Sequence, residues 1–333
     1  MERKRLIWAD SLKGLLIILV VLGHAIQYTL GVHCGSNHLW NIVYSFHMPA
    51  FMAVSGFVAF RPSGGGKITN RLSVIYRRMR QLIVPFFIWT IVLMLVQSGI
   101  SLENIKKYLI YPDNGLWFLW VLFFINVFFI FGDYISERIK SKQDYVIAAI
   151  CMALAAVMVL FEIRVFGFQF FAYYFMFYSF GFFVHKYYDK VVTNNTSITI
   201  GLTFVWIVLA WFWKMHELPS WLHFLPMQGL MQYGYRFITA AIAIYVLFAV
   251  SPLILNKDNT WNRPIMKLGS LSLGIYTTHF ILIGSVVVFC RGLFENDSVV
   301  VVSSFLLALL LSWVIVWLLS KWSVSSKYFL GKI

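Results

Sequence analysis

Apolar stretches long enough to cross a lipid bilayer recur along this chain and limit its fold more than any other feature. A transmembrane helix needs about 20 mainly apolar residues, because the hydrocarbon core is about 30 Å thick. The chain is 60% hydrophobic and 12% charged, unlike a soluble domain. We place the stretches near residues 12–32, 39–60, 82–99, 116–132, 146–163, 167–186, 197–213, 233–255, 270–290 and 299–320. The sequence therefore predicts an all-α polytopic membrane protein with about ten transmembrane helices.

The segments between these stretches are short. We therefore expect one integral-membrane domain over residues 1–333, with no fused soluble domain. The first stretch is too long for a cleaved signal peptide, and no small-residue cleavage site follows it, so we expect it to be retained in a multi-pass plasma-membrane protein. Cys34, Cys151 and Cys290 show neither disulfide nor metal-site spacing, and no metal is expected.

The net charge of +14 is distributed unevenly between the two sides that ten spans define. One side, which holds both termini, carries 21 basic residues and the other carries five. The first group is Arg3, Lys4, Arg5, Lys13, Arg61, Lys67, Arg71, Arg77, Arg78, Arg80, Arg138, Lys140, Lys142, Lys186, Lys190, Lys257, Arg263, Lys267, Lys321, Lys327 and Lys332, and the second is Lys106, Lys107, Arg164, Lys214 and Arg291. This asymmetry predicts cytoplasmic termini. It is a topology signal, and nucleic-acid binding is not expected.

Lys13 and His24 lie in the first stretch, and Asp10 lies one turn before Lys13. Lys13 and His24 are eleven residues apart, so they share a helix face at a separation of roughly 16 Å along the axis. An ionisable side chain at the depth of His24 is costly and indicates a functional site. The alternatives are a neutral imidazole that bonds two helices, an Asp10 that caps the helix with Ser11, and a Lys13 that reaches the headgroups.

Other candidates each have an ordinary explanation as well. Arg77 and Arg80 are three residues apart and suit phosphate oxygens, although basic residues beside a span usually anchor topology. His47 lies two residues before Pro49, and it could either pack against neighbouring helices or line a site. Trp117 is typical of the aromatic belt at a membrane surface. His279 is a further buried titratable group with either role.

Together these motifs resemble acyltransferase family 3 of membrane-bound O-acyltransferases, especially its fucose 4-O-acetylase-like branch. The resemblance runs over nearly the whole chain. Its landmarks are Asp10 with Lys13 and His24, the motif from Phe46 to Gly56 that includes His47, the Arg77-x-x-Arg80 pair, Leu116-Trp117-Phe-Leu, and Leu273-Gly-Ile-Tyr276-Thr-Thr-His279. The chain has lysine at position 13 where the family most often has arginine, which keeps the charge and loses the planar fork.

The resemblance implies an acyltransferase that moves an acetyl group from cytoplasmic acetyl-CoA to a hydroxyl of a cell-surface or lipid-linked glycan. Acetyl-CoA would be a substrate, with no permanently bound cofactor. In this interpretation His24 is the general base or a transient acyl carrier, Asp10 and Lys13 orient the donor, and Arg77 and Arg80 bind its phosphates. His47, Trp117, Tyr276 and His279 are candidates for lining the substrate path. Separate glycan-assembly proteins are expected partners.

Two other classes of protein remain open from the residues alone. A transporter or flippase of a lipid-linked sugar would use the same polar side chains to line a permeation path, and a sensor or structural membrane protein would use them for packing. Most intramembrane polar residues gather in the first three stretches, which favours the enzyme.

Overall fold

The structure, a computed structural model, describes residues 6–60, 68–97, 99–112, 115–161, 163, 165–192 and 195–332. Regular structure within these ranges is helical throughout. Of the basic residues used for the topology prediction, Arg3, Lys4, Arg5, Arg61, Lys67 and Arg164 lie outside the described residues. As predicted, the protein is an all-α polytopic membrane protein. Helices suit this setting, because a backbone that crosses lipid must satisfy its hydrogen bonds within each segment.

The chain forms two compact units, each assembled from two separate segments. Unit 1 comprises Met1–Val58 and Gly181–Val314, and unit 2 comprises Ala59–Phe180 and Ile315–Ile333. We describe each unit by itself. The expectation of one domain over the whole chain stays a prediction.

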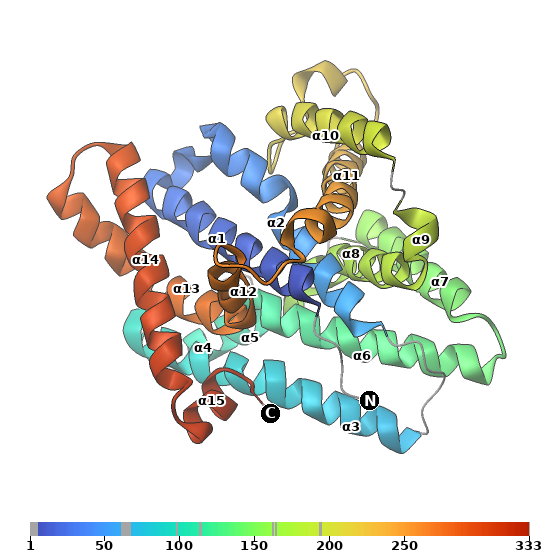
Figure 1. Ribbon diagram of the computed structural model, residues 1–333, viewed down its shortest axis with the longest axis horizontal. Helices are drawn as coiled ribbons and strands as arrows, with labels where there is room; N and C mark the ends of the chain where they lie inside the picture. The colour runs from blue at the N-terminus through green and yellow to red at the C-terminus, as the bar shows by residue number, and fades with distance from the viewer. Residues whose placement is uncertain are drawn as a thin grey trace. The chain divides into compact units, whose positions relative to one another are not determined.

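Unit 1 carries the first two helices of the chain and most of its second half (Figure 1). Its elements are α1 (Ile7–Leu30), η1 (Gly31–Ser36), α2 (His38–Ala59), the end of α8 (Phe168–Lys186), α9 (Tyr188–Val191), α10 (Thr196–Trp211), η5 (Ser220–Leu222), α11 (Gln228–Leu255), α12 (Asn262–Ser270), α13 (Ser272–Leu293) and most of α14 (Asp297–Leu319). Helix α1 packs against α11, α12 and α13.

Unit 2 carries the arginine-rich segment. Its elements are α3 (Ile68–Arg78), the π-helical turn η2 (Met79–Ile83), α4 (Val84–Gln97), α5 (Leu102–Ile110), α6 (Trp117–Arg138), α7 (Gln143–Leu160), η4 (Val165–Gly167), most of α8, and α15 (Ser323–Phe329). Figure 1 shows α3 and α6 side by side. Arg71 on α3 joins them, because it pairs with Asp133 at 3.2 Å and with Glu137, both on α6.

Seven helical segments in the described residues are long and apolar enough to cross a membrane. They are Ile7–Ser36, His38–Ala59, Arg71–Gln97, Trp117–Arg138, Gln228–Leu255, Ser272–Leu293 and Asp297–Leu319. The other three predicted stretches coincide with α7, α8 and α10, of which α7 and α10 offer only shorter apolar segments. The third span is also longer than expected. Helix α3 lies between the predicted stretches 39–60 and 82–99, and it continues through η2 into α4.

Two glycines set the close packing of α12 on the first turns of α1. A Cβ atom on Gly14 would overlap the carbonyl group of Ile265, and one on Gly269 would overlap the carbonyl oxygen of Asp10. The two backbones therefore touch where Asp10 and Lys13 lie.

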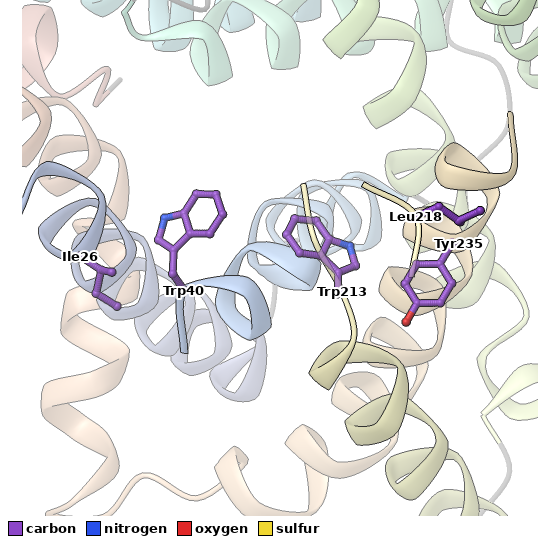
Figure 2. Close-up of a cluster of buried hydrophobic side chains, with 5 residues drawn as sticks. All are labelled: Ile26, Trp40, Trp213, Leu218 and Tyr235. Atoms are coloured by element: carbon purple, nitrogen blue, oxygen red, sulfur yellow. The ribbon is translucent and has the colours of Figure 1, made fainter. Parts of the chain in front are cut away.

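At the other end of α1, a mainly aromatic cluster packs α1 against α2, α11 and the segment between α10 and α11. Figure 2 shows its buried members, which are Ile26, Trp40, Trp213, Leu218 and Tyr235. The Tyr235 hydroxyl donates a hydrogen bond to the carbonyl oxygen of Leu209 at 2.6 Å, which ties α11 to α10. The cluster holds α1 in place just beyond His24.

Candidate functional site

Helix α1 carries Asp10 and Lys13 on its first turns, where they form an ion pair. Lys13 Nζ lies 2.9 Å from Asp10 Oδ1, and their side chains are 23% and 15% exposed. The partial exposure leaves the ammonium accessible while the carboxylate fixes its position. A pair three residues apart on one helix is a local interaction that the sequence spacing already indicated.

Asp10 does not cap α1. The N-cap residue is Leu6, without a side-chain cap, and Asp10 lies inside the first turn. Ser11 donates its hydroxyl hydrogen to the Ile7 carbonyl oxygen instead of capping the helix. The capping alternative is therefore wrong, and Asp10 is left to pair with Lys13 near the positive end of the helix dipole.

His24 lies about three turns further along α1, roughly 16 Å from Lys13 along the axis. It is only partly buried, and its ring edges meet the rings of Tyr28 and Phe280 at centroid distances of 6.4 and 5.7 Å. The three candidates on α1 thus form two separate features, an ion pair at one end and an imidazole deep in the span.

The structure brings His24 and His279 together, although 255 residues separate them in the chain. His24 Nδ1 lies 3.0 Å from His279 Nε2, and the ring planes are tilted by 32°. His279 lies on α13 and is 0% exposed, and its own Nδ1 lies 2.7 Å from the Ile275 carbonyl oxygen. His279 is therefore the fully buried member of a pair of imidazoles, and His24 is the partly buried one.

The sequence did not predict this pairing, since both histidines were separate candidates. The only available signal was that each is a titratable residue inside an apolar stretch. Tyr276, one turn before His279, has its ring centroid 6.0 Å from that of His279 and is 6% exposed.

His47 lies on α2, which packs beside this part of α1. It is 3% exposed, and its Nδ1 donates to the Val43 carbonyl oxygen at 2.7 Å. Its ring contacts that of Tyr44 at a centroid distance of 4.8 Å, and the Tyr44 hydroxyl donates to Gln27 Oε1 at 2.6 Å. Gln27 is one turn after His24, so α1, α2 and α13 each contribute polar side chains to one region of unit 1.

Arg77 and Arg80 belong to unit 2 and lie where the α-helix α3 changes into the π-helical turn η2. Arg77 lies in the last turn of α3 and Arg80 in η2. Pro85 explains the turn, because proline has no N–H group and its ring crowds the carbonyl group four residues earlier, at Gln81. The N–H of Val84 accordingly bonds the Met79 carbonyl oxygen, five residues back. Arg77 therefore lies on an α-helical segment and Arg80 on a π-helical one, rather than both on one regular α-helix.

Both arginines of the pair are partly buried. The guanidinium carbon of Arg80 lies 5.8 Å from the centroid of the Tyr76 ring. Arg71, which lies earlier on α3, pairs with Asp133 and Glu137 and so holds α3 against α6.

Trp117 packs inside unit 2. Its ring stacks on Phe170 at 4.7 Å and on Tyr174 at 4.9 Å, with interplanar angles of 26° and 24°. Both partners lie on α8. These contacts give Trp117 a role in holding α6 against α8.

Among the residues that the structure describes, no group of three or more His, Cys, Asp or Glu side chains is arranged to hold a metal ion. Cys34, Cys151 and Cys290 are free thiols.

The profile of acyltransferase family 3, described as an acyltransferase domain, matches residues 6–317. The chain belongs to this family. The match includes every helix that carries a residue of the site, from α1 to α13. The predicted family resemblance is therefore confirmed.

Two curated relatives are proteins named nodulation protein NolL. The chain is 31% identical over 168 residues to the one from Sinorhizobium fredii (strain NBRC 101917 / NGR234), a match that covers 45% of this chain and 44% of the relative. It is 29% identical over 125 residues to the one from Mesorhizobium japonicum (strain LMG 29417 / CECT 9101 / MAFF 303099), covering 34% and 32%. The chain thus matches less than half the length of these relatives. No solved structure matches it.

Proposed function

We propose that this protein is a membrane O-acyltransferase that moves an acetyl group from acetyl-CoA to a hydroxyl of a cell-surface or lipid-linked glycan. The observation that carries the proposal is a pair of imidazoles, in which Nδ1 of the partly buried His24 lies 3.0 Å from Nε2 of the fully buried His279. An imidazole can take up a proton at a ring nitrogen that carries a lone pair and can then return it, which acyl transfer to a hydroxyl requires.

In the proposed reaction the acceptor hydroxyl loses its proton to His24 Nε2 as its oxygen attacks the thioester carbonyl carbon. A new C–O bond forms, the C–S bond breaks, and the CoA thiolate leaves and takes up the proton that His24 returns. The products are an O-acetyl ester and free CoA. In a two-step variant His24 Nε2 first attacks the thioester carbonyl carbon, so that a C–N bond forms, the C–S bond breaks and CoA leaves as the thiolate. The hydroxyl oxygen then attacks the acetyl carbon, the C–N bond breaks, and the hydroxyl proton passes to the CoA thiolate.

Cationic side chains support the choice of a phosphate-rich donor. Lys13 keeps a partly exposed ammonium beside Asp10, and the guanidinium groups of Arg77 and Arg80 are partly buried. Guanidinium groups bind phosphate oxygens through paired, charge-assisted hydrogen bonds. We propose that Arg77 and Arg80 bind the phosphates of CoA from the cytoplasmic side of the plasma membrane, and that Lys13 with Asp10 orients the donor.

We propose the acceptor from the family of this protein and from the location of the protein in a membrane. A multi-pass membrane enzyme acts on acceptors that reach the membrane, such as a lipid-linked sugar or a growing exopolysaccharide of the cell envelope. Glycan-assembly proteins would supply this acceptor.

The test uses purified full-length protein in lipid nanodiscs, acetyl-CoA labelled in the acetyl group, and membranes that contain the native glycans. We expect His24→Ala to lower label transfer by about 100-fold or more, since general base catalysis contributes 10²- to 10⁴-fold. Thr278→Val is the control, because among the described residues the buried Thr278 hydroxyl bonds only carbonyl groups of its own helix, α13. Near-normal transfer by His24→Ala would refute the proposed centre.

A second arm of the same assay addresses the donor. Arg77→Gln with Arg80→Gln is expected to raise the KM for acetyl-CoA several-fold. Arg263→Gln is the matched control, because Arg263 is an exposed arginine already paired with Asp258. An unchanged KM in the double variant would show that Arg77 and Arg80 anchor the topology of the adjacent span instead of binding the donor. No transfer by the wild type, together with accumulation of a lipid-linked sugar in a deletion strain, would favour the transporter.

A further inference from the structure

His279 is a polar side chain that a substrate does not reach. It is 0% exposed, and each of its ring nitrogens has a partner within the protein. A role in lining the substrate path, which the sequence had left open for it, therefore does not fit. Its position directly behind His24 calls for a different explanation.

The bond on the far side of His279 determines where its hydrogen lies. Its Nδ1 is 2.7 Å from the carbonyl oxygen of Ile275, the residue four positions earlier on α13. A carbonyl oxygen can only accept, so Nδ1 carries the hydrogen. A neutral imidazole has one ring hydrogen, and therefore Nε2 of His279 is an acceptor.

A charged form of His279 would not be supported here. Its polar neighbours are a carbonyl oxygen and another imidazole, and a buried cation without a counter-charge is costly. The neutral tautomer is the one that matches both bonds.

The accepting Nε2 of His279 in turn determines where the hydrogen of His24 lies. At 3.0 Å from the accepting Nε2 of His279, Nδ1 of His24 must be the donor. The single hydrogen of neutral His24 is then on Nδ1, and its Nε2 carries the lone pair. No hydrogen-bond partner of this Nε2 is found among the described residues.

His47 shows how the site of His24 differs from an ordinary buried histidine. His47 and His279 each donate from Nδ1 to the carbonyl oxygen four residues earlier on their own helix. His24 instead donates to a neighbouring helix, so its tautomer depends on α13.

We propose that His279 is a positioning residue that holds His24 in the Nδ1–H tautomer, through a relay from the Ile275 carbonyl oxygen, so that Nε2 of His24 is free to accept a proton or an acyl group. The inference rests on the proposed role of His24 at the reaction centre. It assigns to the late-helix histidine a task distinct from contact with either substrate.

The experiment compares His279→Leu, which removes the acceptor at similar volume, with His279→Gln, whose amide oxygen can still accept from His24 Nδ1. Thr278→Val is again the control for a buried change on α13. We expect His279→Leu to lower kcat by roughly 10- to 100-fold, with the KM for acetyl-CoA changed by less than about twofold. His279→Gln should restore a substantial part of kcat, which a loss of packing alone would not do.

A second readout needs no activity. In protein labelled with ¹⁵N at histidine, the ring signals of His24, assigned by their loss in His24→Ala, should report hydrogen on Nδ1 in the wild type and in His279→Gln. In His279→Leu the hydrogen should move to Nε2, at least in part.

The outcomes separate the two proposals. If His24→Ala is inactive while His279→Leu keeps its kcat and the His24 tautomer, the positioning role is wrong and the proposed function stands. If His279→Leu and His279→Gln lose kcat equally with the His24 tautomer unchanged, His279 serves packing only. If His24→Ala is active, the proposed function fails whatever the spectra show.

Discussion

At the residue scale, the ion pair of Lys13 with Asp10 makes the role of the lysine open to a direct test. The ammonium is 2.9 Å from the carboxylate and is still partly exposed, so it can contact a donor phosphate while Asp10 holds it. If Lys13 merely reaches the headgroups, removal of its charge should lower the acetyl-transfer activity only slightly.

We therefore expect Lys13→Arg to keep much of the acetyl-transfer activity and Lys13→Met to lose it. Arginine retains the charge and the approximate reach, whereas methionine retains only the stem. One charge-assisted hydrogen bond is worth on the order of 1.5–3 kcal/mol, roughly a ten- to hundred-fold effect on rate if it acts in the transition state. Initial rates at matched protein amounts measure this. Similar rates for Lys13→Arg, Lys13→Gln and Lys13→Met would show that Lys13 only reaches the lipid headgroups and has no role in the site.

At the scale of elements, backbone contacts and irregular turns place the charged residues. The short helix α12 lies against the first turns of α1 because neither Gly14 nor Gly269 has a side chain to keep the backbones apart. In unit 2, Pro85 widens the helix into the π turn that carries Arg80. Such turns are common at functional sites, and here one accompanies the proposed phosphate ligands.

Gly269→Val should destabilise the protein, because its side chain would overlap the backbone of Asp10. Overpacking of a tight contact costs typically 1–3 kcal/mol, and this contact involves backbone that cannot swing aside. We expect a clearly lower Tm in detergent and a reduced activity, since Asp10 and Lys13 must shift. Gly201→Val is the matched control, as it adds the same side chain to a helix where a Cβ atom would meet nothing within 4 Å. Equal Tm values for the two variants would contradict the close packing of α12.

At the scale of the whole molecule, the sides of the membrane depend on whether α7, α8 and α10 cross it. Ten crossings place both termini in the cytoplasm, Glu217 outside and Lys257 inside. If only the seven longer segments cross, three crossings are lost between α6 and α11, and Glu217 and Lys257 exchange sides.

We expect ten crossings, and cysteine labelling can decide between the two arrangements. In a protein whose native Cys34, Cys151 and Cys290 are replaced by serine, Glu217→Cys should react with a membrane-impermeant maleimide added to intact cells. Lys257→Cys should react only after the membrane is opened. Both positions lie in polar connections between helices. The reverse pattern would contradict ten crossings and cytoplasmic termini.

The sequence by itself determined the helical class, the approximate positions of the membrane-spanning stretches and the family. These properties depend on local quantities, namely the length of apolar runs and the spacing of motif residues along one helix. The pair of Asp10 and Lys13 belongs to the same category, because three residues along one helix fix the separation of two side chains. The spans of α1, α2 and α13 were accordingly close to their predicted limits.

Only the tertiary structure decided which buried histidine meets which. Nothing local links His24 to a residue 255 positions away, and their contact depends on how α1 and α13 turn toward each other when they pack. The helix α12 and the π turn before Pro85 were likewise not predicted, because a backbone contact and a rearranged hydrogen bond leave little trace in hydrophobic periodicity. The sequence specifies which side chains are present, whereas the tautomer of His24 depends on His279, which helix packing places beside it.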